Sequence, residues 1–187
     1  MSLSRIIYAL LLLIAAYSTY YLYNGRDQDT QQVAPSSELP TLSGQDVDNI
    51  TYDEDGVRNY RIASAFLDHY ASSGNTVFTS PVLSVYREGH TEEWRIIAEQ
   101  GILTQEQILT LQGNILAKNL LPEASFDTMA TDKLVIHLKN RDFWADNQVL
   151  LAGPDFETQG QKMKGNFGDN TATLYDRVHV RYETLTP

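Results

Sequence analysis

Apolar and polar side chains alternate with a period of two through most of the chain beyond Val47, and this pattern constrains the fold more than any other feature. Segments 94–99 and 133–138 show it most clearly. Their more apolar face consists of Trp94, Ile96, Ala98, Leu134, Ile136 and Leu138. A period of two is typical of β-strands with one buried face.

Turn signals separate these segments at short intervals. They are Asp55-Gly56, Gly74-Asn75, Gly89, Gly101, Gly113-Asn114, Gly153-Pro154, Gly165-Asn166 and Gly168-Asp169-Asn170. The twelve-residue spacing of Gly89, Gly101 and Gly113 is expected of a meander with strands of similar length. No segment repeats apolar residues with a convincing helical period. The pattern predicts an all-β domain, and leaves open whether its antiparallel strands form a sandwich, a jelly roll or a closed barrel.

The last predicted strand is amphipathic. One parity carries Ala172, Leu174, Val178, Val180 and Tyr182, and the other carries Arg177, His179 and Arg181. A half-polar strand at the end of a chain is typical of a sheet edge, whose unpaired backbone groups can bind a strand of another protein.

Residues 6–23 contain no charged side chain. At 1.5 Å per residue, such a helix is about 27 Å long and spans a thin bilayer. Tyrosines crowd its second half, where a membrane interface would lie, and Arg5 precedes it. We therefore expect a transmembrane anchor over 1–23 with the N-terminus inside. The alternative is a cleaved signal peptide, because Ala16-Tyr17-Ser18 resembles a cleavage site.

Residues 24–46 are rich in Asp, Gln, Ser, Thr and Pro and poor in apolar side chains. This composition predicts a flexible linker. The β domain is then expected over 47–187.

Composition excludes several functions. The chain of 187 residues carries a net charge of −10, which opposes binding to nucleic acid. It has no cysteine, so disulfides and thiolate chemistry are absent. The four histidines lack metal-ligand spacing, and no nucleophile elbow or phosphate-binding loop occurs. We predict no catalytic residue, no metal site and no cofactor.

Several motifs along the chain resemble the LptC family of lipopolysaccharide export proteins. They are Gly56 with Tyr60-Arg61-Ile62-Ala63, Phe78 and Pro81, 94–98, Leu111-Gln112-Gly113-Asn114, Thr131-Asp132-Lys133-Leu134, Gly153, Gly160, Met163-Lys164-Gly165-Asn166 and Tyr182-Glu183. The resemblance implies a twisted β-jelly-roll in the periplasm, held at the inner membrane by one N-terminal helix. It implies a non-enzymatic protein that receives lipopolysaccharide from an inner-membrane ABC transporter and passes it to an LptA-like periplasmic protein.

The resemblance, together with strand parity, also implies site residues. An open apolar groove is expected between the sheets, lined by Phe78, Ile136, Leu138, Ala172, Leu174 and Tyr182. Contacts with the transporter and the periplasmic partner are expected at Val47, Gly56, Gly153, Val178, Val180 and Tyr182. A protein this acidic must hold a polyanionic glycolipid mainly by its acyl chains. The alternative is a membrane-anchored scaffold that recruits partners through strand edges and binds no lipid.

Overall fold

The computed structural model describes residues 39–122, 124 and 126–182. Fourteen strands and no helix occur in this part of the chain, so the all-β prediction is confirmed. The first seven strands are β1 (Leu42–Tyr52), β2 (Arg58–Tyr70), β3 (Asn75–Thr79), β4 (Val82–Arg87), β5 (Thr91–Ile97), β6 (Gln100–Leu103) and β7 (Ile108–Asn119). The others are β8 (Thr128–His137), β9 (Asp142–Ala145), β10 (Val149–Ala152), β11 (Phe156–Gly160), β12 (Lys162–Asn166), β13 (Thr171–Tyr175) and β14 (His179–Tyr182).

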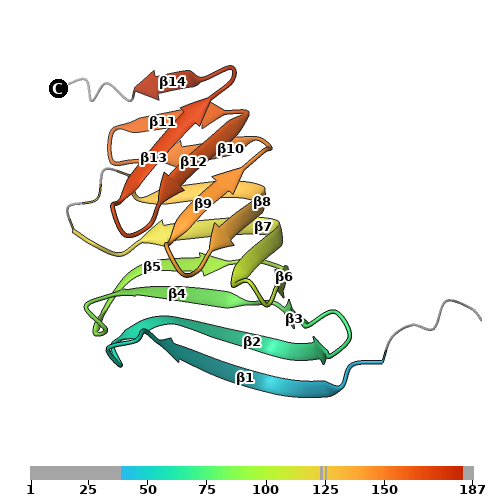
Figure 1. The fold of residues 1–187 in the computed structure, drawn as a ribbon. Helices are drawn as coiled ribbons and strands as arrows, with labels where there is room; N and C mark the ends of the chain where they lie inside the picture. The colour runs from blue at the N-terminus through green and yellow to red at the C-terminus, as the bar shows by residue number, and fades with distance from the viewer. Residues whose placement is uncertain (1–38, 123, 125, 183–187) are drawn as a thin grey trace, which may run out of the picture. The chain divides into compact units, whose positions relative to one another are not determined.

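All pairings are antiparallel. Some join consecutive strands, such as β1 with β2 and β7 with β8, and others join strands further apart in the chain, such as β3 with β6, β9 with β12 and β11 with β14. The sheet is folded lengthwise into two halves that face each other (Figure 1). Half A contains β3, β6, β9, β12 and β13, and half B contains β4, β5, β10, β11 and β14. The long strands β2, β7 and β8 pair with members of both halves. They therefore connect the halves directly.

We call the line where strands pass between halves the crease. Backbone distortions mark it: φ is positive at Asp46, Ser80, Asn114, Asp176 and Arg177. In β7 the pairing register with β8 shifts between Gln112 and Ile115, around Gly113 with its φ of 81°. Such bulges bend a strand strongly. Gly113-Asn114 thus turns the sheet within β7, and Gly101 lies inside β6, although both patterns read as hairpin turns in the sequence.

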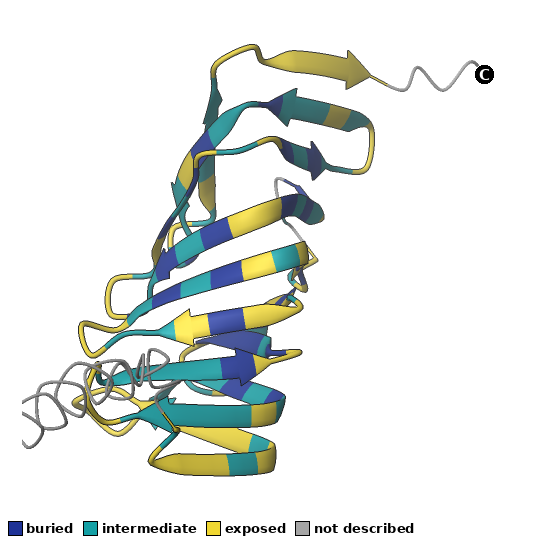
Figure 2. Cartoon of the chain, turned by 90° about the vertical axis from the view of Figure 1, so that its right-hand side faces the viewer, coloured by how far each residue is buried: buried dark blue, intermediate teal, exposed yellow. Residues whose placement is uncertain are grey.

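The hydrophobic core fills the space between the halves. Trp94, Ile96, Leu134, Ile136 and Leu138 are all buried, which confirms the predicted inner faces. Figure 2 shows the buried residues alternating with exposed ones along the central strands, while β1 and β14 at the two ends are largely exposed.

The start of the β domain differs from the composition-based prediction. β1 begins at Leu42, so the last residues assigned to the linker pair with β2, from Leu42 with His69 to Gln45 with Phe66. Backbone pairing overrides the polar composition there. The predicted anchor, 1–23, lies outside the described residues, and among the described residues no helix suitable for crossing a membrane is present.

Candidate functional site: the inner apolar surface and the strand edges

Three of the predicted groove residues lie deep between the two halves. Phe78 on β3 is 1% exposed and belongs to the core together with Ile136 and Leu138. A cavity of about 10 Å³ remains beside Ile136 and Leu138. This volume holds at most one water molecule. The interior is therefore filled by the protein's own side chains.

The other three lie at the C-terminal end of the same inner surface. Residues directly opposite each other in a ladder point to the same face. Leu174 pairs with the buried Met163, and Ala172 with Gly165, so both face inward, where they pack against the core. Tyr182 pairs with Phe156 and also faces inward.

At this end the inner surface becomes exposed. Val180 is 50% exposed and Tyr182 73% exposed, although both lie on the inward face of β14, and the neighbouring Val178 is also exposed. In Figure 1, β12 and β13 run obliquely across half B, and all four residues of β14 are exposed. A continuous apolar surface thus extends from the buried core to an open edge.

Gly153 supports this edge by its lack of a side chain. It begins the connection between β10 and β11, where its N–H donates to the Phe156 carbonyl at 2.9 Å. An added Cβ would overlap the Phe156 ring. Gly153 therefore fixes the position of an aromatic side chain opposite Tyr182.

The N-terminal end presents a second open edge. Within the described residues β1 pairs only with β2, and Val47 lies half-buried opposite Ser64. Gly56 lies in the β1–β2 turn with a φ of 76°, and no atom lies within 4 Å of an added Cβ. Glycine is therefore favoured here by the backbone conformation and not by lack of space. At the other end, β14 pairs only with β11 in this part of the chain. Both edges can accept a further strand.

Opposite the crease, the turns at the free ends of half A face those of half B, and we call this boundary the mouth. Near β1 it opens into a cavity of about 670 Å³. Asp53, Glu54, Asp55 and Glu106 line it with a single cation, Lys139. The surplus of carboxylates disfavours an anionic ligand here.

Further along, side chains of half A close the mouth by hydrogen bonds to half B. Arg141, in the β8–β9 turn, donates to the Asn59 side-chain oxygen at 2.8 Å and to the Tyr86 carbonyl at 3.0 Å. Asn170, in the β12–β13 turn, accepts from Trp94 Nε1 at 3.1 Å. We call the bonds of Arg141 and Asn170 to half B the mouth contacts.

The mouth contacts include a buried carboxylate. Asn170 also accepts from Asn119 at 3.2 Å and donates to Glu93, which is 0% exposed and bonded to Arg87. A bulge between β4 and β5 makes Glu93 the extra residue, since Val85 pairs with Trp94 and Tyr86 with Glu92. The bulge directs the Glu93 side chain inward. The alternating sequence pattern gave no indication of it, because only pairing with β4 creates the bulge.

An aromatic cluster lies beneath the mouth contacts and joins the halves. The Trp94 ring centroid is 5.1 Å from that of Phe167 and 5.4 Å from that of Phe126. Phe167 in turn lies 4.2 Å from Phe143 of half A. The two distances from Trp94 lie in the range typical of favourable aromatic pairs, and Phe167 and Phe143 are in still closer contact.

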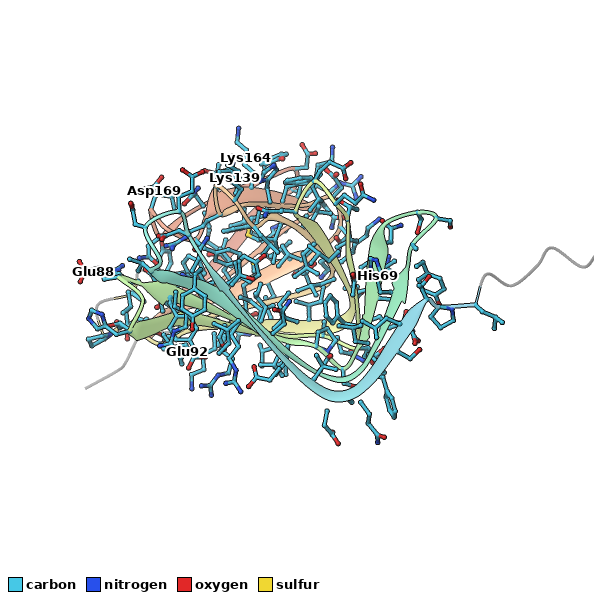
Figure 3. The ribbon with its side chains drawn as sticks, turned by 60° about the horizontal axis from the view of Figure 1, so that its bottom comes forward. His69, Glu88, Glu92, Lys139, Lys164 and Asp169 are labelled. Carbon is cyan, nitrogen blue, oxygen red and sulfur yellow. The ribbon has the colours of Figure 1, made fainter. Side chains whose placement is uncertain are left out.

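The outer faces carry ion pairs. Arg61 pairs with Asp48 at 2.7 Å, and Arg95 with Glu92 at 2.6 Å. Hydrogen bonds from Arg95, more than its charge, hold the pKa of Glu92 below its usual value. In Figure 3, Glu92 lies on one side of the domain and Lys164 on the other, with side chains filling the space between. The described residues contain no group of three candidate metal ligands.

Comparison with known proteins identifies the family. A sequence profile described as lipopolysaccharide-assembly, LptC-related, matches residues 8–183. A lipopolysaccharide export system protein LptC of Haemophilus influenzae is 28% identical, covering 91% of this chain and 90% of that protein. The protein of the same name from Escherichia coli K12 is 29% identical, covering 83% of this chain and 81% of that one.

A solved structure shares the fold. LptH, described as the LptA-homologous periplasmic component of the lipopolysaccharide transport device of Pseudomonas aeruginosa, superposes with a TM-score of 0.54 at 9% identity. The match covers 67% of this chain and 95% of that one.

The profile match spans nearly the whole chain and confirms the resemblance drawn from its motifs. LptC is a non-enzymatic component of lipopolysaccharide transport, which confirms the prediction that the chain is not an enzyme. The chain belongs to the LptC family.

Proposed function

We propose that the β domain binds lipopolysaccharide by its acyl chains, on the inner apolar surface between the two halves. The observation that supports this is the continuity of that surface, from the buried core to the exposed Val180 and Tyr182. Each buried methylene contributes about 0.8 kcal/mol, so several chains bind tightly without help from charge. The contact residues in this proposal are Phe78, Ile136, Leu138, Ala172, Leu174 and Tyr182.

The two open edges support a role as a link between other proteins. We propose that β1, with Val47 and the nearby Gly56, faces the inner-membrane ABC transporter that delivers the lipid. The opposite edge, with Gly153, Val178, Val180 and Tyr182, faces an LptA-like protein that accepts it. The shared fold with LptH supports strand-to-strand stacking, since two similar inner surfaces would then become continuous.

We further propose that residues 1–23 form a retained transmembrane helix, with the domain in the periplasm and the residues before β1 as its tether. Mass spectrometry of the membrane-extracted protein tests this directly. Peptides preceding Ser18 are expected, whereas a mature N-terminus at Thr19 would establish a cleaved signal peptide.

The binding mode is tested by comparing lipid A with its fully deacylated headgroup. The full-length chain should bind lipid A saturably and should not bind the deacylated headgroup. Equal binding of the two would show that the headgroup carries the affinity, and the inner surface would lose its assigned role.

The bridging role is tested by deleting residues 178–187, which removes β14. The shortened chain should lose the LptA-like partner in co-purification and keep the transporter. The matched control, Arg181→Ala with His179→Ala, changes only outward side chains of β14 and should retain the partner. Unchanged partner binding by the folded deletion variant would show that β14 is not the edge that binds the LptA-like partner.

One observation favours the scaffold alternative, a protein that recruits partners and binds no lipid. The interior is filled, with Phe78 sealed and almost no free volume beside Ile136. A scaffold would bind both partners normally while failing to bind lipid A, and the two measurements above separate these functions.

A further inference from the structure

The filled interior places a condition on lipid binding. Trp94 of half B packs against Phe167, which packs against Phe143 of half A, and a cavity of only about 10 Å³ lies beside Phe167. An acyl chain cannot pass between these rings at their present separation. For acyl chains to pass between these rings, the two halves must move apart.

The two halves are connected in one way at the crease and in another way at the mouth. At the crease, β2, β7 and β8 run continuously from one half to the other, so separation there would break the sheet. At the mouth the halves are joined by side-chain hydrogen bonds, chiefly those of Arg141 and Asn170. Opening is therefore far easier at the mouth than at the crease.

The chemistry of the mouth contacts favours reversible opening. When the mouth opens, the broken hydrogen bonds are replaced by bonds to water, so the net free-energy cost of losing each bond is small. Glu93 adds to this, because its Oε2 is buried without a hydrogen-bond partner and would gain solvation when the halves separate. The closed state thus contains one buried carboxylate oxygen without a hydrogen bond, and opening exposes it to water.

Both bonding residues lie in turns that hold them in an unusual backbone conformation. φ is 65° at Arg141 and 52° at Asn170. The Arg141 carbonyl also accepts from the Phe167 N–H at 3.0 Å, which ties the two turns of half A together. Release of one turn is thereby coupled to release of the other and to movement of Phe167.

We propose that the mouth is a lateral gate for the acyl chains, held closed by the bonds of Arg141 to Asn59 and Tyr86 and of Asn170 to Glu93, Trp94 and Asn119. Lipid enters between the halves when these bonds break, and the acyl chains displace the aromatic side chains of the cluster. This inference rests on the proposed lipid-binding function and adds the route of entry.

A cysteine-free chain allows a direct test. Asn119→Cys with Asn170→Cys places one thiol on each side of the mouth, and a short bismaleimide joins them. The control, Lys164→Cys with Thr173→Cys, joins two exposed neighbours within half A. The full-length proteins, in phosphatidylcholine nanodiscs, are mixed with fluorescent lipid A, and uptake is followed by energy transfer from Trp94 and Trp144.

Before cross-linking, the mouth variant should load about tenfold faster than wild type, because its Asn170 bonds are lost. After cross-linking it should load at least about tenfold more slowly than wild type, since the gate cannot open. The cross-linked control should load at the wild-type rate. If the double variant fails to fold, Asn170→Ala provides the same test of faster loading.

Loading at the wild-type rate with the mouth cross-linked would overturn the gate and leave the proposed function intact, since lipid would then enter from an open edge. Failure of wild type itself to take up lipid A would overturn both. A purely structural role for Asn170 would lower stability without accelerating uptake, which would also exclude the gate.

Discussion

Replacing Phe167 by Ala tests whether the aromatic cluster holds the two halves together. Phe167 is fully buried and its ring lies 4.2 Å from Phe143 and 5.1 Å from Trp94. Truncating a phenylalanine in such a site costs about 3–5 kcal/mol, from lost burial and from the cavity left behind. Against a total stability of about 5–15 kcal/mol, this is a large fraction.

Urea unfolding followed by tryptophan fluorescence measures this loss, because Trp94 contacts the substituted ring. Phe66→Ala is the matched control: the same atoms are removed from an outward, half-exposed side chain on β2. It should cost no more than about 1 kcal/mol. A loss below about 1 kcal/mol for Phe167→Ala would refute the argument that this ring joins the halves.

Substitutions at three further positions test separate parts of the structure. Gly153→Val should displace the Phe156 ring, costing about 1–3 kcal/mol and weakening partner binding at β14, and normal partner binding would argue against this support. Gly56→Ala should cost about 1 kcal/mol in urea unfolding through its φ of 76°, while Gly56→Asn should cost less; equal costs would point to a contact instead. Folding lowers the pKa of Glu92 below 4.5 through hydrogen bonds from Arg95, so the unfolded state binds more protons in the window just below pH 4.5. The stabilisation is present above that window and lost as pH falls through it. In urea unfolding at pH values from 3 to 6, Glu92→Gln should reduce the fall in the free energy of unfolding toward low pH. An unchanged fall would exclude this contribution of Glu92.

The sequence was sufficient to predict which faces are buried. Alternation over 94–99 and 133–138 identified Trp94, Ile96 and Leu134 as inward-facing, because a strand's side-chain period depends only on its backbone. The resemblance to LptC, which profile comparison confirms, also followed from local motifs. Properties encoded by neighbouring residues were therefore accessible.

Properties that depend on pairing between distant residues could not be predicted from the sequence. Gly113-Asn114 reads as a hairpin turn, yet it bends β7 at the crease because β8 pairs on both sides of it. Asn170 and Glu93 are 77 residues apart, and their bond exists only because the halves fold together. Similarly, β1 begins at Leu42 in a polar segment since β2 supplies its hydrogen bonds.

The central claim is that acyl chains contact the inner apolar surface, and strand parity offers its most direct measurement. A photo-cross-linking residue is introduced in cells at the inward positions Ala172, Leu174 and Tyr182, and at the outward neighbours Thr173 and Arg181. Lipopolysaccharide adducts should form at the three inward positions and be absent from the two outward ones. Adducts of equal yield on both faces, or on the outward face alone, would contradict the account.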